Sequence, residues 1–122
     1  MSCLFDSLSQ FIEMDASNLR QGICDFLQTN PKLTDDMSAK DVISFESNTP
    51  LENYVMRMRQ YSTMGGATEI KAFCIMFNRN AKVLSIPNDR IIEFVVDPAF
   101  SFIHLKWTGG HYDPIRDTGD LC

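Results

Sequence analysis

Residues 101–115, SFIHLKWTGGHYDPI, predict two β-strands joined by a tight turn. Apolar and polar residues alternate from Ser101 to Trp107, which is typical of a strand with one buried face. Thr108-Gly109-Gly110 predicts the turn, and the chain should continue as a last strand through Ile115. His111 and Asp113 are two residues apart in this second strand, so their side chains should point to the same face.

Helices are expected before these strands. Apolar spacing, capping residues and glycine or proline stops predict helices over residues 4–12, 16–29 and 39–45, from Thr49-Pro50-Leu51-Glu52 onward, and from Gly65-Gly66 to near Asn78. Two further strands are expected over residues 82–86 and 90–97, with Pro87-Asn88-Asp89 as the turn between them. Helices followed by strands indicate an α+β fold rather than a doubly wound sheet.

Length and composition indicate one globular domain. The chain has 122 residues, of which 44% are hydrophobic and 22% charged, so it can bury a single core without disulfides or metal. No apolar run approaches the roughly 18 residues that span a bilayer, and the N-terminus does not resemble a signal peptide. The net charge of −5 disfavours nucleic-acid binding and favours a basic partner. No membrane or nucleic-acid partner is therefore expected.

The four cysteines are far apart and form no CxxC pair. They are Cys3, Cys24, Cys74 and Cys122. This spacing argues against a zinc site and against a secreted disulfide framework, and thiols that are not paired suit a reducing compartment. We expect a cytoplasmic protein without a metal or an organic cofactor.

A thiol nucleophile needs a base, and the base needs a third group that fixes its tautomer. Cys3 starts the predicted first helix, where unpaired N–H groups and the helix dipole favour an anion such as a thiolate. If the fold brings the two ends together, His111 and Asp113 would complete a Cys-His-Asp triad. The alternatives are a terminal cysteine without function and a surface polar pair on an edge strand. His104 has no carboxylate within a few residues, and it is the weaker candidate for the base.

Several short segments resemble the ovarian-tumour (OTU) family of cysteine proteases. Met1-Ser2-Cys3-Leu4-Phe5-Asp6-Ser7-Leu8 is similar to its nucleophile segment, and His111-Tyr112-Asp113-Pro114-Ile115 is similar to its histidine strand. Leu19-Arg20, Ile23 and Phe26-Leu27 resemble its second helix. Met64-Gly65-Gly66-Ala67-Thr68-Glu69-Ile70, preceded by Tyr61 and followed by Ala72, resembles its Trp-Gly-Gly-x-x-Glu helix start. These matches follow the family's order along nearly the whole chain.

The resemblance implies a papain-like fold with a small mixed β-sheet packed against helices. It implies a single catalytic domain over residues 1–115, followed by a tail over residues 116–122. The implied activity is hydrolysis of the isopeptide bond after the C-terminal Gly-Gly of ubiquitin, with Cys3 as nucleophile, His111 as base and Asp113 as its partner.

The same resemblance suggests further roles. Backbone N–H groups of Ser2 and Cys3 would form the oxyanion hole, and Trp107, Gly109 and Gly110 would line the channel for the substrate tail. The expected partner is ubiquitin or polyubiquitin, or a ubiquitin-like protein, bound by a monomer. The compact size is similar to that of viral members, for which the compartment would be the host cytoplasm.

Two positions depart from the family's pattern. Members usually carry Asp-Gly-Asn directly before the cysteine, whereas only Met1 and Ser2 precede Cys3, and Met64 stands where a tryptophan is usual. Two alternatives therefore stay open. The chain could be an inactive ubiquitin-binding module, since the loss of one oxyanion donor costs roughly 100-fold or more in rate. It could also be a protease that processes a polyprotein.

Overall fold

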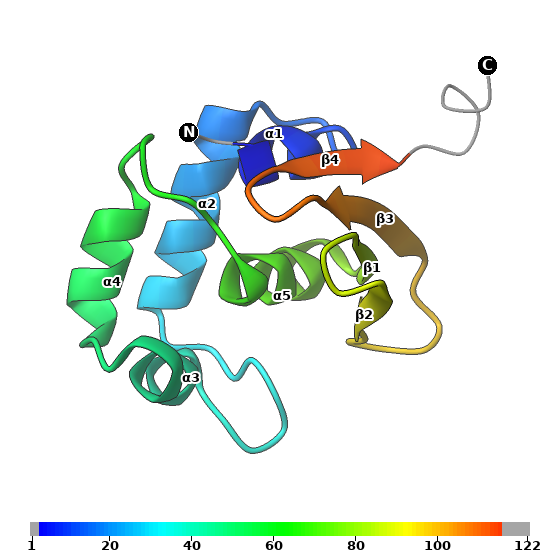
Figure 1. Ribbon diagram of the computed structural model, residues 1–122. Coiled ribbons are helices and arrows are strands. Elements are labelled where there is room, and N and C mark those ends of the chain that lie inside the picture. The colour runs from blue at the N-terminus through cyan, green and yellow to red at the C-terminus, as the bar shows by residue number, and fades with distance from the viewer. Residues whose placement is uncertain (1–2, 116–122) are drawn as a thin grey trace.

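The computed structural model describes residues 3–115, and residues 1–2 and 116–122 lie outside the described part. Within residues 3–115, five helices precede four strands. Figure 1 shows how these elements are arranged. The helices are α1 (Cys3–Ser9), α2 (Ala16–Gln28), α3 (Ala39–Ser47), α4 (Leu51–Met58) and α5 (Ala67–Phe77), and the strands are β1 (Asn80–Ser85), β2 (Arg90–Phe94), β3 (Phe102–Trp107) and β4 (Tyr112–Ile115). The expected α+β class is confirmed.

The sheet is mixed, with the strand order β2-β1-β3-β4. β1 and β3 are parallel, whereas the β1–β2 and β3–β4 pairs are antiparallel. β4 is an edge strand, which explains why it tolerates Pro114, a residue without an N–H group to donate. α1 lies beside β4, so the first and last elements of the described chain are neighbours (Figure 1).

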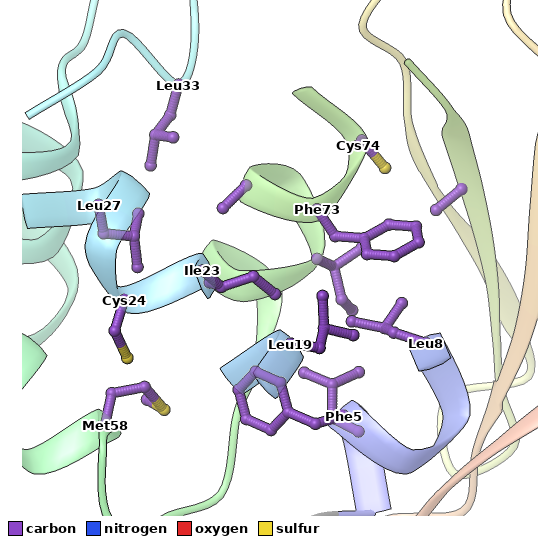
Figure 2. Close-up of a cluster of buried hydrophobic side chains, with 14 of the residues drawn as sticks. Phe5, Leu8, Leu19, Ile23, Cys24, Leu27, Leu33, Met58, Phe73 and Cys74 are labelled. Carbon is purple, nitrogen blue, oxygen red and sulfur yellow. The ribbon is translucent and has the colours of Figure 1, made fainter. Parts of the chain in front are cut away.

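The core joins α1, α2 and α5 beside the sheet. Figure 2 shows Phe5 and Leu8 of α1 converging with Leu19 of α2 and Phe73 of α5. All four side chains are fully buried. Burial of a Leu or Phe side chain contributes roughly 1.5–3 kcal/mol, so this cluster fixes the short helix α1 firmly against its neighbours.

Capping residues set several helix starts as the sequence predicts. The Asp15 carboxylate accepts a hydrogen bond from the N–H of Asn18 at 2.7 Å and caps α2. Ser38 and Asp41 form a capping box at the start of α3, which is longer than predicted. α5 ends at Asn78, which adopts the left-handed conformation that commonly terminates helices.

Several expected boundaries were wrong, including those of β1, which spans Asn80–Ser85 rather than residues 82–86. α1 stops at Ser9, and a turn replaces the predicted helix over residues 10–12. Thr49 does not cap α4, because its hydroxyl donates to the carbonyl of Ser47 and Pro50 occupies the N-cap position. β2 ends at Phe94 rather than at residue 97.

β2 ends where its neighbour β1 begins, because the register that pairs Phe94 with Ala81 puts Val96 and Asp97 opposite residues that precede β1. The buried side chain of Asn80 serves these two residues instead. Its Oδ1 accepts hydrogen bonds from the N–H groups of Val96 and Asp97, at 2.8 and 3.3 Å. Within residues 3–115, no helix is long and apolar enough to cross a membrane.

Candidate functional site

The nucleophile candidate Cys3 is the first residue of α1, and its side chain is 9% exposed. Leu4, Phe5 and Leu8 of the same helix are buried in the core, so packing fixes the position of the helix start. The first N–H groups of a helix have no acceptor within it. The backbone at Cys3 therefore offers donors beside its own thiol.

His111 enters the site from the loop between β3 and β4. Its carbonyl accepts a hydrogen bond from the N–H of Thr108 at 3.0 Å, which closes the loop. Gly109 lies in this loop with φ +109°, a value that side chains rarely permit. The Trp107 and Tyr112 rings flank the loop as a cross-strand pair, 6.3 Å between centroids. These contacts hold both ends of the loop and place His111 directly before Tyr112, the first residue of β4.

The imidazole and the carboxylate predicted from the strand spacing contact each other. Nε2 of His111 lies 3.1 Å from Oδ1 of Asp113, and the two side chains are 56% and 45% exposed. An Nε2–H that donates to Asp113 leaves Nδ1 as the nitrogen with a lone pair. Nδ1 is then available to take a proton from a thiol.

A surface cleft of about 290 Å³ brings the candidate residues together. Cys3 lines one side, from the start of α1, and His111 and Asp113 line the other, from β4 and the loop before it. The remaining lining residues are Asp6, Ser7, Gln10, Tyr112 and Pro114. A thiol, an imidazole and a carboxylate around one opening are the groups that nucleophilic acyl transfer requires.

Ser7 joins the two sides of the cleft, a contact that sequence reasoning missed. Its Oγ lies 2.8 Å from the carbonyl oxygen of Cys3 and 3.0 Å from the carbonyl oxygen of Tyr112. The side chain is 2% exposed. The signal in the sequence was a hydroxyl one helical turn after Cys3, between the apolar residues Phe5 and Leu8.

The Tyr112 phenol, which also lines the cleft, has a raised pKa. Burial, with a further contribution from negative charge on Cys3 and Glu69, raises the pKa of the Tyr112 phenol above its ordinary value. Its hydroxyl therefore stays protonated at neutral pH, and the charge of the cleft depends on the other groups that line it.

Behind the nucleophile, Gly65 and Arg20 support α1. A Cβ atom at Gly65 would lie 2.7 Å from Leu4 Cδ2, so only glycine permits this close approach. The Arg20 guanidinium lies 4.2 Å from the centre of the Phe5 ring and donates to the carbonyls of Met58, Tyr61 and Thr63. Sequence reasoning missed this role of Arg20, whose signal was a charged residue inside the apolar face of a predicted helix.

The other predicted site residues lie outside the cleft or outside the described chain. Trp107, Gly109 and Gly110 do not line the cleft, although Trp107 packs beside Tyr112, which does. Ser2, the second proposed oxyanion donor, lies outside residues 3–115. The roles of these four residues stay predictions.

The remaining cysteines and His104 occupy other places. Cys24 and Cys74 are fully buried, and this burial raises the pKa of each thiol to about 11. Cys122 lies outside the described part of the chain. His104 is in the middle of β3, on the face opposite to the buried side chains of Ile103 and Leu105. Among the described residues, no group of three His, Cys, Asp or Glu side chains could hold a metal ion.

Comparisons with known proteins identify the fold through solved structures. No protein-family model and no curated protein sequence matches the chain. An OTU domain solved in complex with ubiquitin matches with a TM-score of 0.74 and 23% identity, over 93% of this chain and 62% of the other. The OTUD1 OTU domain matches with a TM-score of 0.72 and 19% identity, over 95% and 79%.

A third match is the viral OTU domain protease from Dera Ghazi Khan virus, with a TM-score of 0.66 and 16% identity, over 93% of this chain and 72% of the other. The chain thus spans less than two thirds of the first of these structures and about three quarters of the other two. It has the OTU fold, as the sequence motifs predicted.

Proposed function

We propose that this OTU-fold chain is a deubiquitinating cysteine protease, which cleaves the isopeptide bond between the C-terminal glycine of ubiquitin and a lysine amine. The observation that carries the proposal is the shared cleft, which Cys3 lines together with the hydrogen-bonded pair of His111 and Asp113. The similarity to OTU domains supports this class of reaction at the level of the fold.

In the first step His111 accepts the thiol proton at Nδ1, and the Cys3 thiolate attacks the carbonyl carbon of the glycine. The tetrahedral intermediate collapses, the C–N bond breaks, and the imidazolium donates its proton to the departing lysine amine. A thioester between Cys3 and ubiquitin remains. Asp113 holds the imidazole orientation through Nε2 and stabilises its charged form.

In the second step His111 removes a proton from water, and the resulting hydroxide attacks the thioester. The C–S bond breaks, ubiquitin leaves with a free carboxylate, and the thiol is restored. The oxyanion in both steps would accept hydrogen bonds from the N–H groups of Cys3 and Ser2. Trp107, Gly109 and Gly110 are the proposed walls for the Gly-Gly tail.

Charge supports ubiquitin as the substrate. The tail of ubiquitin carries arginine before its Gly-Gly end, and this chain has a net charge of −5. Two carboxylates, Asp6 and Asp113, line the cleft. The first matching OTU domain was solved with ubiquitin bound, which supports the same partner for this chain. The proposed compartment is the cytoplasm, where a catalytic thiol stays reduced.

Ubiquitin carrying a C-terminal electrophile tests the proposal. The parent protein should form a covalent adduct on Cys3, and Cys3→Ala should form none while still folding. Ubiquitin that binds the parent without forming an adduct would support the binding module instead. Cleavage of a flanking peptide without cleavage of a ubiquitin chain would support the polyprotein protease.

A further inference from the structure

Ser7 connects α1, which begins with Cys3, to β4, which follows His111. Ser7 and Tyr112 are 105 residues apart, yet Ser7 Oγ lies 3.0 Å from the Tyr112 carbonyl oxygen. The same Oγ lies 2.8 Å from the carbonyl oxygen of Cys3. These two carbonyls belong to the nucleophile itself and to the residue between His111 and Asp113.

Ser7 is buried next to a carbonyl that has no partner in the described sheet. The side chain is 2% exposed, so water does not compete with its hydrogen bonds as it would at the surface. β4 is an edge strand and Tyr112 pairs with β3 on one side only, so a carbonyl on its outer edge needs a donor from elsewhere. α1 lies along this edge (Figure 1). Ser7 supplies the donor, and its one hydroxyl hydrogen is shared between the carbonyls of Tyr112 and Cys3.

The apolar contacts of α1 do not set this alignment alone. Phe5 and Leu8 pack into the core beside Leu19 and Phe73 (Figure 2), and apolar packing is not directional. A hydrogen bond has a preferred distance and angle, so it fixes how far α1 slides along β4. A shift of about 1 Å between reacting groups can cost roughly 100-fold in rate.

We propose that Ser7 is a positioning residue, whose hydroxyl sets the register between α1 and β4 and thereby holds the Cys3 thiol against His111. The inference rests on the proposed function, because it assigns Ser7 to the same thiol–imidazole pair. Ser7 does not itself touch the reacting atoms. Ser7 acts by setting the distance between the Cys3 thiol and the His111 imidazole.

Ser7→Ala is the direct test, and Ser9→Ala is its matched control. Ser9 Oγ donates to the Asp6 carbonyl at 2.8 Å within the same helix, but it is a local contact three residues apart. Both variants therefore lose one hydroxyl-to-carbonyl bond of α1, and only Ser7→Ala loses the link to β4. Ser7→Thr retains the hydroxyl and serves as the conservative rescue.

The first readout needs no ubiquitin. All variants carry Cys122→Ser, and the rate of Cys3 alkylation by iodoacetamide is measured against pH in each of them. The other titratable side chains that line the cleft, Asp6, Tyr112 and Asp113, are the same in every variant. In the parent, His111 should keep Cys3 reactive below the usual thiol range, and His111→Ala should abolish this. Ser7→Ala should lower this low-pH reactivity about tenfold, whereas Ser9→Ala should not.

The second readout is hydrolysis of a ubiquitin-fluorophore substrate. Ser7→Ala should lower kcat with little change in KM, and Ser7→Thr should recover most of it, while circular dichroism shows that all variants fold. Equal low-pH reactivity in Ser7→Ala and the parent would overturn the role of Ser7 alone. A parent that shows the low-pH reactivity but no ubiquitin cleavage would overturn the deubiquitinase alone. A parent without that reactivity would overturn both.

Discussion

Nε2 of His111 and Oδ1 of Asp113 lie 3.1 Å apart across one intervening residue of the chain. The sequence predicted His111 inside the last strand, but His111 is the loop residue directly before β4 and Asp113 is the second residue of β4. Their side chains still emerge on the same face. The contact also assigns the two ring nitrogens, because the nitrogen that contacts the carboxylate cannot face the thiol. The nitrogen left to accept a proton is therefore Nδ1.

Cys3 should be the cysteine of residues 3–115 that reacts first with iodoacetamide near neutral pH. Burial raises the pKa of Cys24 and of Cys74 to about 11, so both thiols are protonated and shielded in the folded protein. Peptide mapping by mass spectrometry after brief treatment measures the order of labelling. Faster labelling of Cys24 or Cys74 in folded protein would contradict the assignment of the nucleophile.

His111→Ala should abolish hydrolysis of a ubiquitin-fluorophore substrate, whereas His104→Ala should retain most of it. Only His111 lines the cleft with Cys3, and His104 lies in the middle of β3 away from it. Steady-state rates and circular dichroism of both variants measure the effect. The same loss of rate in both folded variants would show that His111 is not the specific base.

Asp113→Ala should lower kcat/KM roughly 100-fold, since nothing would then hold the imidazole in the required tautomer. Asp113→Asn should lose less, because its side-chain oxygen can still accept from Nε2–H although the negative charge is gone. A pH–rate profile of each variant checks this order. If Asp113→Ala cleaves as fast as the parent at every pH, Asp113 is not the third member of the triad.

Gly65→Ala should lower both the stability and the activity. The added Cβ would lie 2.7 Å from Leu4 Cδ2 and 3.1 Å from the Phe5 ring, in the core behind Cys3. Overpacking of this kind typically costs about 1–3 kcal/mol in the free energy of unfolding. Gly66→Ala is the control, since its Cβ would meet no atom within 4 Å. Urea denaturation should show the larger loss for Gly65→Ala.

Glu69 should make the stability depend on pH. Its carboxylate is fully buried and accepts hydrogen bonds from Tyr54 Oη and from the N–H of Gly66, at 2.5 and 2.7 Å. Burial raises the pKa of the Glu69 carboxyl above its ordinary value. Stability from this shift is complete below the ordinary carboxyl range, and it is lost as pH rises through the folded-state pKa.

Glu69→Gln cannot ionise but keeps the size and the acceptor oxygen. The free energy of unfolding of the parent, relative to Glu69→Gln, should therefore fall as pH rises above the ordinary carboxyl range. Urea denaturation at several pH values measures the difference. Glu52→Gln, at an exposed position in the first turn of α4, should show no such fall. A parent that gains stability over Glu69→Gln with rising pH would contradict the direction of the pKa shift.

The sequence by itself determined the local features of this protein. Asp15 and Ser38 cap α2 and α3 at the starts expected for these helices, because a side-chain oxygen three residues before a backbone N–H is a local arrangement. The alternation that buries Ile103 and Leu105 follows from the two-residue period of a strand. The contact of His111 with Asp113 is also local, because the two residues are two apart in the chain, although His111 lies in the loop before β4. Resemblance to a known family supplied the fold.

The tertiary structure alone decided what lies beyond one element. No local pattern predicts that the Asn80 side chain would hold the backbone beyond β2, because its partners lie 16 and 17 residues away in the chain. The same holds for Ser7, whose hydrogen bond to the Tyr112 carbonyl exists only after α1 has packed along the edge of β4. Periodicity specifies which face of an element is buried, but not which distant face covers it. The presence of Cys3 and His111 in one cleft is therefore a property of the packed core and not of either segment.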